Sequence, residues 1–325
     1  MPKLRSPLSV LFAAPLLTAF ALMMVPATAQ DYPNRPITLV VPFPPGGSTT
    51  IVARIVADKM SEALGQSIVV DNRAGAGGTI GSRAVSRTAP DGYTILLGYT
   101  GTLAIGPTLY PNAGYDPRKD FTPIGRIGTA PNTLVVHPSV PVQSASELIA
   151  YAKANVGKVF YGSAGIGTVS HVCGEYFASA AGVKIAHIPY KGTGPAIIDL
   201  LGGHIPMAFA PVPATHENAK NGKLRMLAVT SAARSTLLPD VPTISETALP
   251  GFEAVLRYGF VAPPAIVARL NAALNTALAS PDVRARLAVD GAEPLPSTPE
   301  EYGADIDREE TQWSKVVRES GAKAE

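Results

Sequence analysis

The segment 42–54 combines residue types that can bind an anion without a charged side chain. It reads Pro-Phe-Pro-Pro-Gly-Gly-Ser-Thr-Thr-Ile-Val-Ala-Arg, so Gly46 and Gly47 stand directly before Ser48. The first N–H groups of a helix lack intrahelical partners and lie at the positive end of the helix dipole. A helix that begins at this turn would bind an anion through its backbone. The alternative is a tight turn in which Ser48 or Thr49 is an ordinary helix cap.

A second loop, 162–168, repeats this pattern of small residues and reads Gly-Ser-Ala-Gly-Ile-Gly-Thr. Residues 98–102, Gly-Tyr-Thr-Gly-Thr, place further hydroxyls at the end of a predicted strand. In open α/β sheets, ligands bind at the carboxyl ends of the strands. The recurrence of such loops favours a ligand site over a set of ordinary turns.

Nearby serines and a histidine raise the alternative of an exported hydrolase that uses Ser163 or Ser170 with His171. The sequence has no G-x-S-x-G elbow, because the glycines around Ser163 have the wrong spacing. His171 is better explained as a residue near the ligand or as a hydrogen-bonded core residue. We therefore expect no catalytic residue. The five histidines have no ligand-like spacing, so we also expect no metal site.

A third glycine-rich stretch, 72–81, resembles a loosened dinucleotide fingerprint. Its glycines follow a G-x-G-x-x-x-G spacing, and no clear acidic strand end follows about twenty residues on. An exported protein also meets little nucleotide. We therefore interpret the glycines as a backbone-lined wall or a close helix contact, and we expect no cofactor.

Alternating β and α patterns position these loops. Strand-like runs at 37–41, 68–70, 93–97, 159–161, 184–188, 205–209 and 225–229 alternate with helical periodicity, which indicates mostly parallel sheets covered by helices. Two further runs, 124–127 and 133–136, flank a predicted crossover near Ala130, and a strand at about 254–261 carries the chain back. We expect one domain from 30–130 plus 252–325 and a second from 131–251.

The N-terminus has the pattern of a secretory signal. Lys3 and Arg5 precede an apolar run from about Leu8 to Met24, and residues 27–29 form an A-x-A site. Pro15, Pro26 and the A-x-A ending argue against a membrane anchor. We expect a 1–29 signal peptide, cleavage near Ala29/Gln30 and a periplasmic protein.

The charge of the mature chain excludes a class of partners. Removal of residues 1–29 takes away two basic residues and leaves 25 basic and 25 acidic ones. A neutral chain has no electrostatic footprint for a polyanion, so we expect no nucleic-acid partner. Cys173 is the only cysteine, which excludes an internal disulfide.

With the loops laid out, the sequence closely resembles the substrate-binding proteins of tripartite tricarboxylate transporters, the Bug family. The resemblance covers essentially the whole mature chain and rests on seven motifs in order. These are PPGG at 44–47 followed by Ala53-Arg54, NRAGAGG at 72–78, PDGY at 90–93, HIPYKG at 187–192, LLGG at 200–203, GKLR at 222–225 and LPDVPT at 238–243.

The resemblance implies an α/β fold of the periplasmic binding protein type II class, with two doubly wound α/β domains around a central ligand cleft. It implies a Venus-flytrap protein that closes on a small organic carboxylate and delivers it to the membrane permease subunits of a tripartite tricarboxylate transporter. The carboxylate would be held by backbone amides, hydroxyls and water from loops matching 43–48 and 163–168. We expect a monomer that is not an enzyme.

Pattern and resemblance together give the candidate ligand-binding residues Phe43, Gly46, Gly47, Ser48, Thr100, Ser163, Gly167, Thr168, His171, Thr193 and Arg257. Two positions depart from the family, in which many members carry Asp at the position of Thr50 and an aromatic at that of Arg257. If Arg257 faces the cleft, it pairs with a second ligand carboxylate. The alternative is a solvated surface side chain.

Overall fold

The computed structural model describes residues 32–110, 112–263, 267–289 and 291–324. All of the elements below lie in one compact unit, Arg35–Glu325. The predicted signal peptide and its cleavage site fall outside the described residues. No helix in the described part of the chain is long and apolar enough to span a membrane.

Ten strands form one continuous sheet in the order β2-β1-β3-β9-β4-β7-β5-β6, with β8 and β10 also paired to β4. The strands are β1 (Ile37–Val41), β2 (Ile68–Asn72), β3 (Thr94–Tyr99), β4 (Thr122–Val136), β5 (Phe160–Ser163), β6 (Ala186–Pro189), β7 (Met207–Pro211), β8 (Arg225–Val229), β9 (Val255–Ala262) and β10 (Glu293–Pro294). In one part β1 is parallel to β2 and β3, and in the other β5 is parallel to β6 and β7. The expected parallel arrangement therefore occurs twice, on either side of the antiparallel strands β9 and β4.

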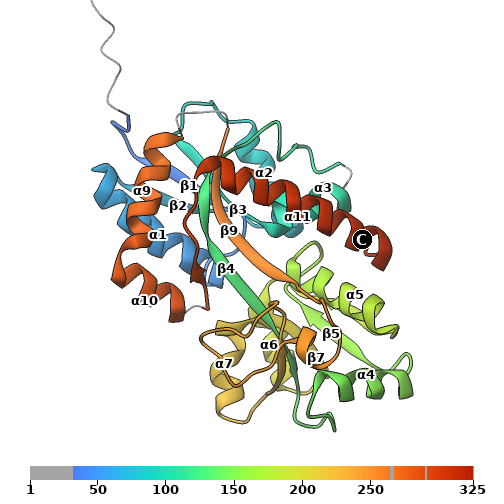
Figure 1. Ribbon diagram of the computed structural model, residues 1–325. Helices are drawn as coiled ribbons and strands as arrows, with labels where there is room; N and C mark the ends of the chain where they lie inside the picture. The colour runs from blue at the N-terminus through green and yellow to red at the C-terminus, as the bar shows by residue number, and fades with distance from the viewer. Residues whose placement is uncertain (1–31, 111, 264–266, 290, 325) are drawn as a thin grey trace, which may run out of the picture. The chain divides into compact units, whose positions relative to one another are not determined.

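Strand β4 belongs to both parts of the sheet. Its residues up to Pro131 pair with β9, and from Asn132 onward they pair with β7 (Figure 1). The sequence predicted two separate strands here, and that prediction was wrong. Pro131 and the preceding glycines interrupt the apolar pattern, but Pro131 stands where the partner strand changes, and a missing N–H is tolerated there.

Helices cover the sheet and connect its strands. They are α1 (Ser48–Leu64), α2 (Thr79–Ser86), α3 (Gly106–Leu109), α4 (Ala145–Ala154), α5 (Val169–Ala181), α6 (Thr193–Leu201), α7 (Val212–Lys220), α8 (Ile244–Thr247), α9 (Ala268–Ala279), α10 (Pro281–Val289) and α11 (Pro299–Ser320), with short turns η1 (Ala76–Gly78) and η2 (Gly101–Ile105). The C-terminal helices return to the N-terminal strands. Helices α9 and α10 pack against α1, while α11 packs against β4 and η2 and reaches α5 (Figure 1).

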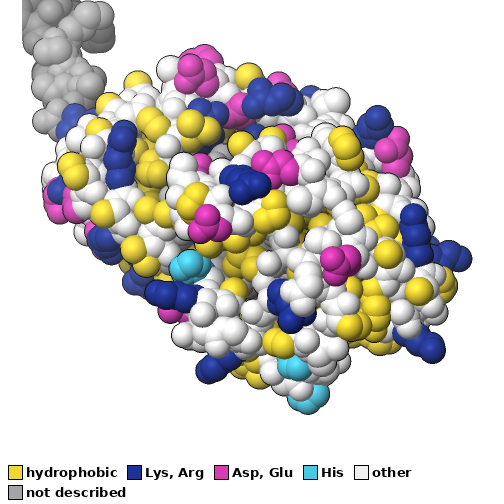
Figure 2. All heavy atoms as spheres, turned by 60° about the horizontal axis from the view of Figure 1, so that its bottom comes forward, with side chains coloured by type: hydrophobic (Ala, Val, Ile, Leu, Met, Phe, Trp, Pro, Cys, Tyr) yellow, Lys and Arg dark blue, Asp and Glu magenta, His cyan; other side chains and the backbone are white. Residues whose placement is uncertain are grey.

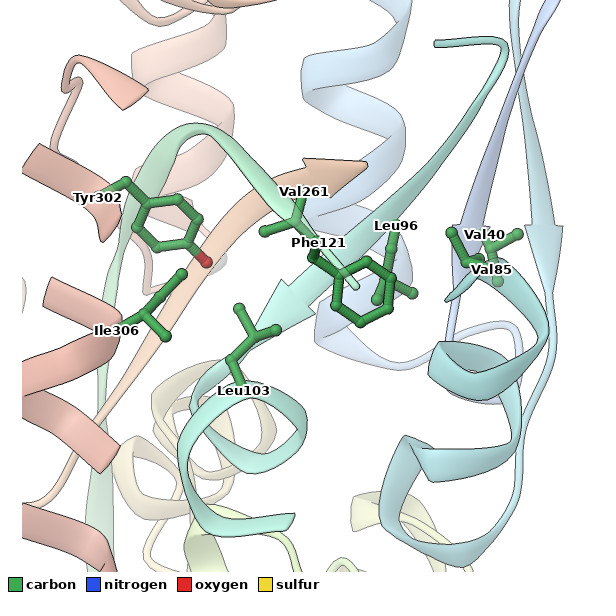
Figure 3. Close-up of a cluster of buried hydrophobic side chains, with 8 residues drawn as sticks. All are labelled: Val40, Val85, Leu96, Leu103, Phe121, Val261, Tyr302 and Ile306. Atoms are coloured by element: carbon green, nitrogen blue, oxygen red, sulfur yellow. The ribbon is translucent and has the colours of Figure 1, made fainter. Parts of the chain in front are cut away.

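A buried cluster joins the N-terminal strands to the C-terminal helix (Figure 3). Strands β1, β3 and β9 contribute Val40, Leu96 and Val261, and α11 contributes Tyr302 and Ile306. Burying such side chains stabilises the fold by about 1.5–3 kcal/mol each. The strands β1, β3 and β9 and the C-terminal helix α11 therefore share one core.

Thr230 connects the two strands that run between the parts of the sheet. Its hydroxyl accepts a hydrogen bond from the Asn132 N–H at 2.9 Å and donates one to the Ala254 carbonyl at 2.6 Å. Its backbone bonds to the same two residues, and its side chain is fully buried. Strands β4 and β9 are thus tied together where they leave one part for the other.

Figure 2 shows basic and acidic side chains interspersed on one face of the protein. Eleven ion pairs between Lys or Arg and a carboxylate join described residues, and many of them lie on the surface, such as Arg35 with Asp91. Exposed pairs of this kind contribute little to stability, about 0–1 kcal/mol each. Stability must therefore come chiefly from the packed core.

Candidate functional site

A cavity of about 330 Å³ lies where three helices begin beside the crossover strands. The starts of α1, α5 and α6 supply residues 43–49, 168–170 and 191–195, and the strands supply Tyr99, Asn132, Pro211 and Leu256. We call this the first cavity. It lies at the carboxyl ends of parallel strands, the edge where open α/β sheets bind ligands.

Helix α1 begins without a side-chain cap. Gly47 is the N-cap residue in an extended conformation, with φ −82° and ψ 161°, and no side chain accepts the first N–H groups. Gly46 has φ +87°, which strongly favours glycine. The first bond back into the turn comes from Thr50, so the N–H groups of Ser48 and Thr49 precede it. These two donors lie in the wall of the first cavity.

Side chains fix the loop ahead of α1. The Asn72 amide donates to the Phe43 carbonyl at 2.8 Å and to the Thr50 hydroxyl at 2.9 Å. The Phe43 ring packs edge-on against Tyr99, with ring centroids 4.9 Å apart. The protein's own side chains therefore hold the loop in shape.

Helix α6 begins in the same open way. Its N-cap residue, Gly192, has φ 118° and makes no side-chain cap bond, while its own N–H donates to the Ala164 carbonyl at 3.0 Å. Thr193 and Gly194 supply the first helical N–H groups, and Lys191 precedes the turn. Lys191 is the only charged residue among the described residues that line the first cavity. The wall offers hydrogen-bond donors and a positive charge, with no acidic side chain opposing them.

Helix α5 begins differently, because Thr168 caps it. The Thr168 hydroxyl accepts from the His171 N–H at 3.4 Å and donates to the Gly165 carbonyl at 2.6 Å. Thr168 lines the first cavity, yet its hydroxyl is already engaged. The sequence predicted free amides at the starts of α1 and α5. In the structure the uncapped starts at this cavity are those of α1 and α6.

Two stacked histidines support the loop before α5. His171 and His187 have ring centroids 4.1 Å apart, and His187 Nε2 lies 2.6 Å from the Ser163 hydroxyl oxygen. His171 Nδ1 accepts from the Gly167 N–H at 3.3 Å. Burial lowers the pKa of His171 to about 4, and burial followed by the neighbouring His171 lowers that of His187 to about 3. Both rings are therefore neutral near pH 7.

This geometry does not support the hydrolase alternative. Ser163 is fully buried, and no hydrogen bond between described residues joins His171 to Ser163 or Ser170. The Ser170 hydroxyl accepts instead from the Ala164 N–H at 3.0 Å. These side chains hold the loop in shape, and a nucleophile would need access that Ser163 lacks.

Thr100 and Arg257 belong to a buried polar group behind the site. The Thr100 hydroxyl donates to the Glu309 carboxylate at 3.1 Å, and Arg257 pairs with the same carboxylate at 2.5 Å. Burial raises the pKa of Glu309, although Arg257 and Thr100 lower it. Arg257 is thus neither a solvated side chain nor part of the first cavity wall. Its contact with a ligand stays a prediction, and Glu309 competes for the same guanidinium.

The structure brings together six of the predicted residues in the first cavity: Phe43, Gly46, Gly47, Ser48, Thr168 and Thr193. The other five do not line it: Thr100, Ser163, Gly167, His171 and Arg257. Sequence reasoning missed Asn132, Lys191, Tyr99 and Leu256. A signal for Lys191 was available, because it stands directly before the glycine that opens α6.

A second cavity of about 560 Å³ adjoins the glycine-rich loop 74–78 and residues 164–166 and 189–192. The Tyr110 hydroxyl, also in its wall, donates to the Ile166 carbonyl at 3.0 Å. A Cβ on Gly77 would lie 2.7 Å from that carbonyl oxygen, so the glycine permits the close approach. The loop forms a wall of backbone here. No group of three or more acidic, His or Cys side chains in the described part of the chain could hold a metal.

Known proteins resemble this chain over nearly its whole length. BugT of Bordetella pertussis is 42% identical over 310 residues, which are 94% of this chain and 95% of BugT. The periplasmic binding protein BugD has 40% sequence identity and a TM-score of 0.83, covering 90% of this chain and 99% of that one. An R. palustris protein solved with adipate has 38% identity and a TM-score of 0.85, with 90% and 99% covered.

These likenesses confirm the predicted α/β fold of the periplasmic-binding-protein type. The model of the tripartite tricarboxylate transporter family receptor matches residues 52–322. That family consists of substrate-binding receptors, and proteins of this type work in the periplasm. The chain therefore belongs to the tripartite tricarboxylate transporter receptor family, as the motifs of its sequence predicted.

Proposed function

We propose that this protein captures a small organic carboxylate in the first cavity and delivers it to the membrane permease subunits of a tripartite tricarboxylate transporter. One observation carries the proposal: two uncapped helix starts and Lys191 surround a cavity lined by no acidic residue of the described chain. Backbone N–H groups at helix starts bind carboxylates well. The relative solved with adipate, a dicarboxylate, supports the same class of ligand.

The ligand is held by the backbone rather than by a fixed set of charged side chains. The N–H groups of Ser48, Thr49, Thr193 and Gly194 converge on one carboxylate, and Lys191 adds a long-range attraction. A hydrogen bond to a charged group contributes about 1.5–3 kcal/mol, so a few such bonds suffice for micromolar affinity. This binding requires no cofactor and no covalent step, which favours a receptor that is not an enzyme.

Export, assembly and division into domains complete the proposal. The signal peptide 1–29 is cleaved near Ala29/Gln30, and the mature protein acts as a monomer. One domain comprises 30–130 plus 252–325 and the other 131–251. The ligand cleft lies between them and closes on the carboxylate. The mass of the purified mature protein and its elution on a calibrated size column test the first two statements.

A binding assay tests the central statement. Freshly purified protein is examined by native mass spectrometry for a retained acid and then titrated by calorimetry with adipate, succinate, hexanoate and butyrate. We expect saturable binding to at least one acid and no change in the acid afterwards. Absence of binding to every acid, with no retained acid, would contradict the proposal, and turnover of chromogenic esters would revive the hydrolase alternative.

A further inference from the structure

The second cavity lies between two loops that come from different parts of the sheet. Loop 74–78 follows β2 and forms one wall together with Tyr110 at the end of α3, while loop 164–168 follows β5 and supplies residues of the other wall. The Tyr110 hydroxyl reaches from one wall to the other and donates to the Ile166 carbonyl at 3.0 Å. We call this contact the latch. Among the described residues, no other hydrogen bond joins these two walls.

Each end of the latch is fixed by its own part of the protein. The Tyr110 N–H donates to the Gly106 carbonyl at 2.8 Å, and the Tyr110 carbonyl accepts from the Ala113 N–H at 2.9 Å. The loop that carries the acceptor is fixed by Thr168, whose hydroxyl donates to the Gly165 carbonyl at 2.6 Å. Burial raises the pKa of Tyr110, so its hydroxyl remains a donor near pH 7. Two supported segments therefore meet through one bond.

Two glycines, one on each side, allow the walls to approach each other. A Cβ on Gly77 would lie 2.7 Å from the Ile166 carbonyl oxygen, and a Cβ on Gly167 would lie 2.8 Å from a ring carbon of Tyr110. Both glycines have positive φ, +59° and +78°, which other residues rarely adopt. Neither glycine lines the first cavity, so the latch gives them a role that direct binding of the ligand there does not.

The latch also affects the first cavity, because the two cavities share a wall. Ala164 and Thr168, in the loop that the latch holds, line both of them. The start of α1 faces this loop from the part of the protein that carries Tyr110. A ligand between the two is enclosed only while the loop keeps its place. Movement of the loop away from α1 would open the first cavity, and the latch opposes that movement.

We propose that Tyr110 is a positioning residue, which holds loop 164–168 against loop 74–78 and thereby retains a ligand in the first cavity. The inference rests on the proposed function, because it assumes a ligand in that cavity. When the binding-competent state of a protein becomes less populated, every ligand binds more weakly by the same factor. Loss of the latch therefore weakens all acids alike, whereas loss of a direct contact affects different acids differently.

Two matched tyrosine variants test the latch. Tyr110→Phe removes its hydroxyl and keeps the ring, whereas Tyr115→Phe removes a hydroxyl that donates to the Thr102 carbonyl at 2.7 Å within one part of the protein. Both are titrated by calorimetry with adipate, succinate, hexanoate and butyrate, and release is timed by surface plasmon resonance. We expect Tyr110→Phe to bind every acid that wild type binds about three- to tenfold more weakly, the loss of one hydrogen bond, with correspondingly faster release. Tyr115→Phe should bind and release as wild type does.

A pair of glycine variants separates the latch from stability. Gly77→Ala places a methyl group against the Ile166 carbonyl, whereas Gly182→Ala, at φ +61°, introduces similar backbone strain where a Cβ meets nothing within 4 Å. Both should melt below the wild-type temperature, because alanine disfavours positive φ. Only Gly77→Ala should weaken binding, for every acid and at least as much as Tyr110→Phe.

The possible failures are distinct. Wild-type affinity and release in Tyr110→Phe overturn the inference and leave the proposed function standing. An equal loss in Tyr115→Phe does the same, because it traces the effect to stability in general. A loss in Tyr110→Phe that is confined to some of the acids makes Tyr110 a ligand contact and also overturns the inference. A wild type that binds none of the acids overturns both the inference and the proposed function.

Discussion

Two helix starts at the first cavity, those of α1 and α6, differ from the starts of α8 and α11. Helices α8 and α11, away from the cavity, begin with complete capping boxes, Thr243 with Glu246 and Thr298 with Glu301. Helices α1 and α6 begin at Gly47 and Gly192 and have no side-chain cap. A Ser, Thr or Asp cap contributes about 1 kcal/mol relative to alanine. Helices α2, α3, α7 and α9 also lack a side-chain cap, so a missing cap points to a ligand only where the helix start also lines the cavity.

Helix α5 begins at the first cavity and nevertheless has a side-chain cap. Its start lines the first cavity, yet Thr168 caps it and His171 accepts a further N–H from Gly167. The helix is held by its own side chains and offers less to a ligand. Position beside the cavity is therefore not sufficient, and neither is a missing cap; α1 and α6 combine the two.

The sharpest test gives α1 the cap that it lacks. In Gly47→Asp, a carboxylate at the N-cap position accepts the N–H groups that we assign to the ligand and also repels an anion. Gly47 has φ −82°, which aspartate adopts without strain. We expect affinity for the preferred acid to fall about 100-fold, the loss of two charge-assisted hydrogen bonds, by calorimetric titration.

Gly47→Ala is the control for that variant, because its Cβ would meet only the Pro44 carbonyl oxygen, at 4.0 Å. Its affinity should stay close to that of wild type. The ligand-free Gly47→Asp protein should be as stable as wild type or more stable by a few tenths of a kcal/mol. Wild-type affinity in Gly47→Asp would remove α1 from the site.

Acid should weaken the start of α5 and leave those of α1 and α6 unaffected. Burial lowers the pKa of His171 to about 4, below the value of about 6.5 in unfolded chains, so the unfolded state binds the proton more readily between these pH values. The contribution of neutral His171 to the free energy of unfolding is fully present above pH 6.5 and is lost as the pH falls toward 4. We expect a loss of about 2 kcal/mol from His171 between pH 7 and pH 5, measured by urea unfolding.

The variant His171→Gln does not titrate and retains an acceptor for the Gly167 N–H. Its free energy of unfolding should fall less than that of wild type over the same pH interval. Equal falls in both proteins would show that another group governs the acid sensitivity.

Removing the cap of α5 should affect stability more than binding. Thr168→Ala should lower the free energy of unfolding by about 1 kcal/mol, and Thr168→Ser should recover most of that loss. If the Thr168 hydroxyl also contacts the ligand, as the sequence suggested, affinity falls about tenfold in the alanine variant. Parallel denaturation and titration of the two variants separate the cap from the contact.

The smallest effect is expected from the charge beside α6. Lys191 is exposed, so Lys191→Gln should weaken acid binding only about three- to tenfold, and less at high salt because mobile ions screen an exposed charge. Lys158→Gln removes another exposed lysine that lines neither cavity and should have no effect. Salt-independent loss in Lys191→Gln would indicate a direct, desolvated contact.

Local signals predicted the elements and loops of this protein well. The run 37–41 is β1, 225–229 is β8, and the predicted return strand agrees with β9 to within one residue. These segments are short and apolar, and turn residues bound them, so their structure is encoded locally. The α/β fold class followed from their alternation, and the family comparison confirmed it.

Contacts between distant residues limited the prediction of the site. Thr100 and Arg257 looked available to a ligand, but both bind Glu309, which lies 209 and 52 residues away in the chain. Asn132 follows Pro131, which argues against the interior of a strand, and only the pairing of β4 with β7 places Asn132 at the cavity. No pattern along the chain specifies such partners.

The hydroxyl of Thr230 restricts the mechanics of the connection between the two parts of the sheet. Two strands that were free of each other could slide independently, and the parts could then shear as well as turn. Because the Thr230 hydroxyl bonds both Asn132 and Ala254, and β4 is also paired with β9, sliding of one strand past the other would break buried hydrogen bonds. We therefore expect the two parts to turn rather than to shear at this connection, which Asn132 adjoins beside the cavity.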